Sequence, residues 1–157
     1  FLGAQPNQTA GYIKALRSEG VTSTATVAGR YLTDTTFRKT VLSAAQARFE
    51  GSDGEARTWL YSFEWPTPTS GQAVHCVDLP YLFDCLGDED VPALLGQAPP
   101  QDLADTVHGA AVNFVDHFTE PWPTWSPSRP VAQVFDQGAR LGEALTETAY
   151  TPAAELL

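Results

Sequence analysis

The chain has 157 residues, of which 43% are hydrophobic and 18% are charged, a composition typical of a globular domain and not of a disordered or fibrous protein. Its net charge of −10 argues against nucleic acids and anionic membranes as partners, because both present negative phosphate groups. No apolar run approaches the roughly 20 residues that cross a bilayer, so we expect no membrane span.

The chain contains no methionine and starts at Phe1, so we expect that it was processed or that it is a piece of a longer protein. Residues 1–6 show neither the basic nor the apolar part of a signal peptide. The location therefore stays open, with a slight preference for the cytoplasm.

The first half of the chain is predicted to be mainly helical. Apolar residues spaced by three or four indicate a helix over residues 10–17 and a second over residues 35–49, with Thr33 or Asp34 as the cap of the second. Residues 21–28 are rich in Thr, Ser and Ala and are interpreted as a connector. Residues 57–65 alternate as in a strand, with four aromatic side chains on one face: Trp59, Tyr61, Phe63 and Trp65.

The second half contains shorter elements around one long helix, predicted over residues 102–118. Before it come an apolar segment over 79–86 and one or two helical turns over 88–95 with Asp88 as the cap. After it, a strand over 131–135 is expected to turn at 136–138 and to return at Arg140 and Leu141. The tail, residues 143–157, is predicted to add a half-formed helix.

Together these elements predict an α/β fold class that is rich in helix, with one good strand and a short C-terminal hairpin. One strand and one hairpin are too few for a parallel sheet. The apolar stripes of the helices need a surface to cover, which indicates a unit that packs on a larger sheet.

Known catalytic and binding motifs are missing from the chain. There is no G-x-S-x-G nucleophile elbow, no glycine-rich phosphate loop, no H-E-x-x-H and no C-x-x-C. Cys76 and Cys85 are expected to be reduced and partly buried, because a bridge would close only a short loop. A zinc site built from His75 and these cysteines is disfavoured, since no fourth ligand is evident. We therefore predict no metal and no cofactor.

Three histidines remain as candidates for chemistry. His108 and His117 lie on the long predicted helix and are interpreted as structural or solvated. His75 differs because it follows the predicted strand on a loop, between the apolar residues Val74 and Val77. Catalytic side chains often lie on such loops. A lone loop histidine is nevertheless more often structural than catalytic, so both interpretations stay open on this ground.

Residues 57–83, RTWLYSFEWPTPTSGQAVHCVDLPYLF, resemble the region around the catalytic histidine of bacterial type-B carboxylesterases, the cholinesterase-like esterases and lipases of the α/β-hydrolase fold. That family shows an aromatic strand Y-x-Y-x-F-x-W, a loop rich in Pro and Gly, and then H-[GA]-x-E-L-P-F-V-F. Four further segments resemble the family in the same order: LTDTTFR at 32–38, PQDLADTVHGAAVNF at 100–114, WPTWSP at 122–127 and VFD at 134–136.

The resemblance implies that residues 1–157 are the C-terminal part of a carboxylesterase domain and that His75 is its catalytic histidine. The serine, the acid and the oxyanion donors of the family would then lie upstream of this chain, so we expect the chain alone to be inactive. Phe37, Tyr81 and Phe83 are predicted walls of the substrate pocket, with core aromatics as an equally good interpretation. Asp78 is interpreted as an anchor of the loop and not as the triad acid.

The sequence departs from the family pattern at four positions. Cys76 replaces the usual Gly or Ala, Asp78 the Glu, Cys85 a common Asn, and Thr40 a common Pro. The implied partner is a small carboxylic ester, and self-association through the surface that would meet the missing part is expected. The alternative function is a non-catalytic, cholinesterase-like binding or interaction module.

Overall fold

The computed structural model describes residues 6–157, which form two compact units. Unit 1 comprises residues up to Thr58 together with Trp125–Val131 and Glu147–Leu157, and unit 2 comprises Trp59–Thr124 and Ala132–Thr146. The prediction of no signal peptide depends on residues 1–5, which lie outside the described part. No helix within residues 6–157 combines the length and the apolar character that crossing a membrane requires.

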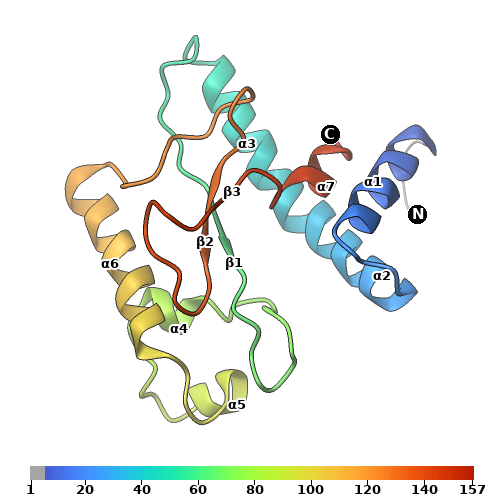
Figure 1. The fold of residues 1–157 in the computed structure, drawn as a ribbon. Helices are drawn as coiled ribbons and strands as arrows, with labels where there is room; N and C mark the ends of the chain where they lie inside the picture. Colours follow the sequence, from blue (N-terminus) through green and yellow to red (C-terminus); the bar gives the residue numbers. More distant parts are fainter. Residues whose placement is uncertain (1–5) are drawn as a thin grey trace. The chain divides into compact units, whose positions relative to one another are not determined.

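Unit 1 is helical, with α1 at Pro6–Ser18, α2 at Thr24–Thr33, a π-helical turn η1 at Asp34–Arg38, α3 at Lys39–Glu50 and a short α7 at Thr151–Ala154 (Figure 1). Its buried core includes a cluster of Tyr12, Leu16 and Leu156. Both predicted helices are present. The tail helix is also present, although it is limited to the four residues of α7.

Two predictions for unit 1 are wrong. Residues 24–28 are not a connector but the start of α2, because the Ser23 side chain accepts a hydrogen bond from the Thr26 amide at 3.1 Å and so caps the helix. The prediction that Thr33 or Asp34 caps the start of the second helix is also wrong, because Thr33 makes no side-chain capping hydrogen bond and Asp34 is the residue that ends α2. Asp34 lies inside the helical stretch, fully buried, where it accepts hydrogen bonds from the Tyr12 hydroxyl at 3.0 Å and from Arg38 at 3.2 Å.

Unit 2 is built on a small mixed sheet in the order β1-β2-β3, with β1 at Tyr61–Phe63, β2 at Ala132–Phe135 and β3 at Leu145–Thr146. Strands β1 and β2 are parallel, with Ser62 opposite Val134, and β3 is antiparallel to β2. Three helices connect β1 to β2: α4 at Leu79–Leu82, α5 at Val91–Leu95 and α6 at Gln101–His117. The helix-rich α/β character is therefore confirmed, but the parallel pair was not predicted.

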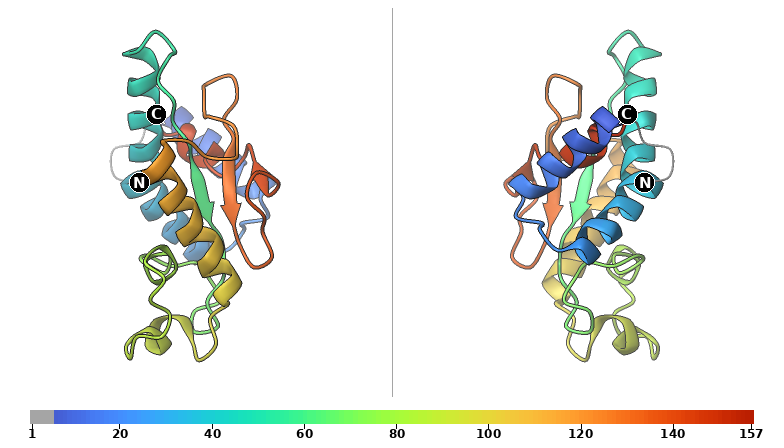
Figure 2. Two further views of the ribbon diagram at one scale, coloured as in Figure 1. Left: turned by 90° about the vertical axis from the view of Figure 1, so that its left-hand side faces the viewer. Right: turned by 90° about the vertical axis from the view of Figure 1, so that its right-hand side faces the viewer.

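Helix α6 lies along one face of the sheet (Figures 1 and 2). Its buried residues Leu103, Val107 and Ala110 pack into one core with Trp65 from the end of β1 and Phe135 from β2. The predicted bounds of this helix differ from the observed ones by one residue at each end. The backbone then turns at Phe118, which has a left-handed φ of 52°.

Three details of unit 2 differ from the prediction. Only three of the nine residues expected in the first strand pair with β2. The turn α5 starts at Val91 after Asp90, so Asp88 is not its cap. The hairpin partner of β2 is Leu145–Thr146 and not Arg140 and Leu141.

Candidate functional site

The predicted catalytic residue, His75, lies on the loop that follows the carboxyl end of β1. The loop leaves the sheet at Trp65, which is buried in the core of unit 2, and it re-enters the core at Val77, which is 2% exposed. Between these two buried residues His75 itself is exposed. The imidazole is therefore open to solvent, as proton exchange with a substrate requires.

The residue after His75 has an unusual backbone conformation. Cys76 has a φ of 65°, in the left-handed region that side chains with a Cβ disfavour and that glycine adopts freely. The Cys76 thiol is half-buried and unbridged, as is that of Cys85.

Asp78 connects the end of the histidine loop to the sheet. The Tyr61 hydroxyl, on β1, donates a long hydrogen bond of 3.4 Å to Asp78 Oδ2. This contact supports the interpretation of Asp78 as a loop anchor. That Asp78 is not the triad acid stays a prediction.

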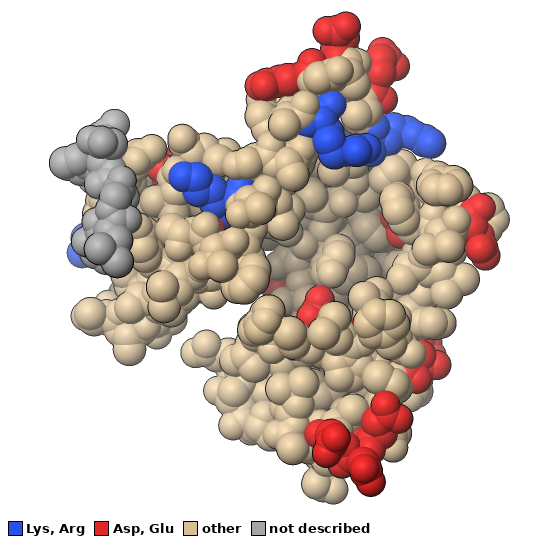
Figure 3. Space-filling view, turned by 180° about the vertical axis from the view of Figure 1, so that it is seen from behind, with Lys and Arg blue, Asp and Glu red and all other residues tan. Residues whose placement is uncertain are grey.

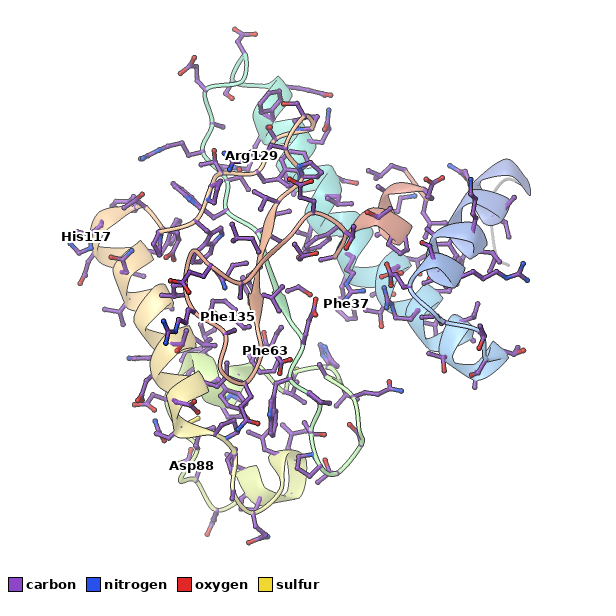
Figure 4. The ribbon with its side chains drawn as sticks, viewed as in Figure 1. Phe37, Phe63, Asp88, His117, Arg129 and Phe135 are labelled. Carbon is purple, nitrogen blue, oxygen red and sulfur yellow. The ribbon has the colours of Figure 1, made fainter. Side chains whose placement is uncertain are left out.

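The three predicted pocket residues have different surroundings. Phe37 is on η1 of unit 1, whereas Tyr81 and Phe83 follow His75 in unit 2 (Phe37 is labelled in Figure 4). Tyr81 is fully buried, with its ring against Phe63 and Trp65 at centroid distances of 5.2 and 5.6 Å. Phe83 is 68% exposed. Tyr81 thus lies in the core, and the substrate-binding assignments of all three residues remain predictions.

The carboxyl ends of the two parallel strands face one open depression of about 690 Å³. Trp65, Pro66 and Pro68 line it after β1, and Asp136 and Gln137 line it after β2. Ligands of α/β proteins commonly bind at this edge of a sheet. The sequence predicts that a strand ends before each of these two lining segments. It does not predict that the segments lie side by side, because that depends on the parallel pairing of β1 and β2.

The other two histidines have structural contacts. His108 Nδ1 lies 2.9 Å from the Leu82 carbonyl oxygen, which ties α6 to α4. His117 is exposed in the last turn of α6, with Nδ1 3.2 Å from the Asn113 carbonyl oxygen. Within residues 6–157 no three His, Cys, Asp or Glu side chains are grouped as a metal site would require.

The charge of the chain is concentrated in the unit that carries His75. Unit 2 contains twelve Asp and Glu residues but a single Arg, Arg140, and no Lys. Its net charge is therefore −11. Exposed Asp88, Glu89 and Asp90 form an acidic stretch just before α5, and Figure 3 shows one group of acidic side chains, at the bottom of the view, with no Lys or Arg beside it. Unit 2 is therefore an unfavourable environment for anionic ligands.

Compared with models of known protein families, the chain matches none.

Proposed function

We propose that this chain provides the catalytic histidine of a carboxylic ester hydrolase, and that the residue is His75. The proposal is supported by the exposed side chain of His75 on the loop that follows β1, a strand of the parallel pair. Both ends of this loop are fixed in the core, at Trp65 and Val77. A rigid frame that presents a solvent-accessible side chain is the common arrangement of catalytic residues.

In the proposed reaction the imidazole accepts the proton of a serine hydroxyl as the serine attacks the ester carbonyl. It then donates that proton to the leaving alcohol. The serine, the triad acid and the oxyanion donors would come from sequence outside these 157 residues, since the chain contains no G-x-S-x-G. The negative charge of unit 2 disfavours esters that carry a carboxylate.

The test is the hydrolysis of p-nitrophenyl butyrate by the complete product of the gene. We expect His75→Ala to lower kcat by about three to four orders of magnitude, because loss of the general base stops proton transfer from the serine. His117→Ala is the matched control and should keep turnover within about twofold, because His117 is exposed at the far end of α6. The 157-residue chain by itself should be inactive.

Near-normal turnover of His75→Ala would refute the proposal. So would a complete gene product that lacks a serine in a nucleophile elbow.

A second candidate function, an interaction module, is favoured by the apolar stripe of α6. The spacing that buries Leu103, Val107 and Ala110 continues to Phe114 and Phe118, but Phe118 is 66% exposed and Phe114 41% exposed. The neighbouring Val115 is also exposed. A helix face that is covered along only half of its length is typical of a surface that binds a partner or a second copy.

Sedimentation velocity tests this candidate on the 157-residue chain. We expect concentration-dependent self-association that Val115→Ser with Phe118→Ser weakens at least tenfold, because the double variant removes the two most exposed apolar side chains at the C-terminal end of α6. Leu32→Ser, which removes an exposed apolar side chain from α2 of unit 1, is the matched control and should leave association unchanged. A wild-type chain that stays monomeric at high concentration would contradict self-association through α6.

A further inference from the structure

The loop that carries His75 is organised around one buried hydroxyl, that of Thr67. Thr67 is 0% exposed, although it lies in a polar loop between two prolines. Its Oγ1 lies 3.0 Å from Thr69 Oγ1 and 2.8 Å from Ser70 Oγ, and it accepts a hydrogen bond of 3.2 Å from the Ser70 amide. The Thr69 hydroxyl donates its proton to the Leu94 carbonyl oxygen and the Ser70 hydroxyl donates its proton to the Gln72 carbonyl oxygen, so Thr67 donates its single proton to one of these two hydroxyl oxygens and accepts from the Ser70 amide.

The main chain of Thr67 closes the same turn. Its amide donates to the Gln72 carbonyl oxygen at 3.2 Å, and its carbonyl oxygen accepts from the Gly71 amide at 2.7 Å. The turn needs a left-handed residue at Gly71, where φ is 68°. Residues 67–72 therefore form one closed turn in which Thr67 is the common partner.

This turn is attached to the rest of unit 2 through α5. The Thr69 hydroxyl donates to the Leu94 carbonyl oxygen at 2.7 Å, at the C-terminal end of that helix. Pro68 also lies close to Gly96, since a Cβ added at Gly96 would be 3.5 Å from the Pro68 ring. Only residues 73–76 separate the closed turn from buried Val77, and His75 is one of these four.

We propose that Thr67 is a positioning residue that acts through its hydroxyl to hold the loop bearing His75 in one conformation. The catalytic consequence rests on the proposed esterase function, whereas the ordering of the loop does not. A displacement of about 1 Å in a catalytic group can cost about a hundredfold in rate, so the loop has to be held before the substrate arrives.

The ordering is tested on the 157-residue chain by backbone ¹⁵N relaxation. Thr67→Val keeps the shape of the side chain and removes the hydroxyl. We expect the order parameters of residues 69–76 to fall from about 0.85 to below about 0.6, while those of α6 stay unchanged. Thr67→Ser keeps the hydroxyl and should restore the wild-type values.

Thr106→Val is the matched control. Within residues 6–157 the hydroxyl of Thr106, in the same unit, makes one hydrogen bond, to the Asp102 carbonyl oxygen at 2.8 Å within α6. Its removal should leave the loop unchanged. Loop order parameters that are the same in Thr67→Val and the wild type would overturn the proposal. The wild type provides a check that needs no variant, because order parameters below about 0.6 for residues 67–72 would also overturn it.

The catalytic consequence is tested in the complete gene product. We expect Thr67→Val to lower kcat about tenfold with KM unchanged, and Thr67→Ser to recover most of the loss. The positioning role would be overturned if His75→Ala inactivates the protein while Thr67→Val lowers the loop order parameters without changing kcat. If His75→Ala has no effect, the proposed function is wrong, and the relaxation data still decide whether Thr67 orders the loop.

Discussion

Two tyrosines show how differently the same buried side chain can be accommodated. Tyr12, in unit 1, donates its hydroxyl proton to Asp34 Oδ2, whereas the Tyr81 hydroxyl in unit 2 is buried without a hydrogen-bond partner in residues 6–157. Burial raises the pKa of both phenols well above the ordinary value, and for Tyr12 the Asp34 charge raises it further. Both hydroxyls therefore stay protonated at neutral pH.

This contrast predicts opposite signs for the same substitution. Tyr81→Phe removes an unsatisfied hydroxyl and should stabilise unit 2 by about 1 kcal/mol, while Tyr12→Phe removes a buried hydrogen bond to a carboxylate and should destabilise unit 1 by about 1 to 3 kcal/mol. Urea unfolding of the two single variants measures both values. A loss of stability in Tyr81→Phe would mean that the hydroxyl has a partner such as a buried water.

At the same scale, local sequence correctly placed His75 on a loop after a strand, whereas its catalytic role stays a prediction. The strand-then-loop pattern and the family resemblance both single out the histidine. Cys76, directly before buried Val77, has a left-handed backbone that a cysteine at this position does not predict.

Among the elements, the accuracy of prediction follows the length of the periodic pattern. Helices α3 and α6 were predicted well because an apolar residue recurs at each turn over three or more turns. Helix α2 was missed because its apolar face is short: Val27 and Tyr31, four residues apart, pack against the core of unit 1, but no side chain of Thr24–Thr33 is fully buried. Its main local signal is the Ser23 cap, which also fits a loop.

Strand pairing shows the opposite case, since it depends on contacts between distant residues. The partner of β2 was expected at Arg140 and Leu141, but those residues belong to a longer loop that wraps around the buried side chain of Gln133. Gln133 Nε2 lies within 3.2 Å of the Arg140 and Ala144 carbonyl oxygens, and its Oε1 accepts from the Gly142 amide at 2.8 Å. A buried amide that satisfies a loop in this way cannot be recognised from turn signals alone.

At the scale of the whole molecule, the distribution of charge is more uneven than the net value of −10 indicates. Unit 2 has a net charge of −11, so unit 1 is nearly neutral at +1. Like charges within unit 2 repel each other more in the compact state than in the unfolded chain, and salt screens this repulsion.

We therefore expect salt to stabilise unit 2. Raising NaCl from about 0.05 to about 0.5 M shortens the Debye length from more than 10 Å to about 4 Å and should raise the melting temperature by several degrees. Near-ultraviolet circular dichroism follows this transition, since Trp59, Trp65 and Trp122 all lie in unit 2. The combined variant Asp88→Asn, Glu89→Gln and Asp90→Asn should show a smaller increase, and an equal increase in both proteins would argue against repulsion as the cause.

The sequence by itself determined the helix-rich character, the long helix α6, the position of His75 after a strand and the negative charge, because each of these depends on local residue spacing or on composition. The tertiary structure alone decided the parallel pairing of β1 with β2, the burial of Asp34, Thr67 and Gln133, and the core position of Tyr81. These features depend on contacts between residues far apart in the chain, and a polar side chain can be buried only where distant groups supply its hydrogen bonds.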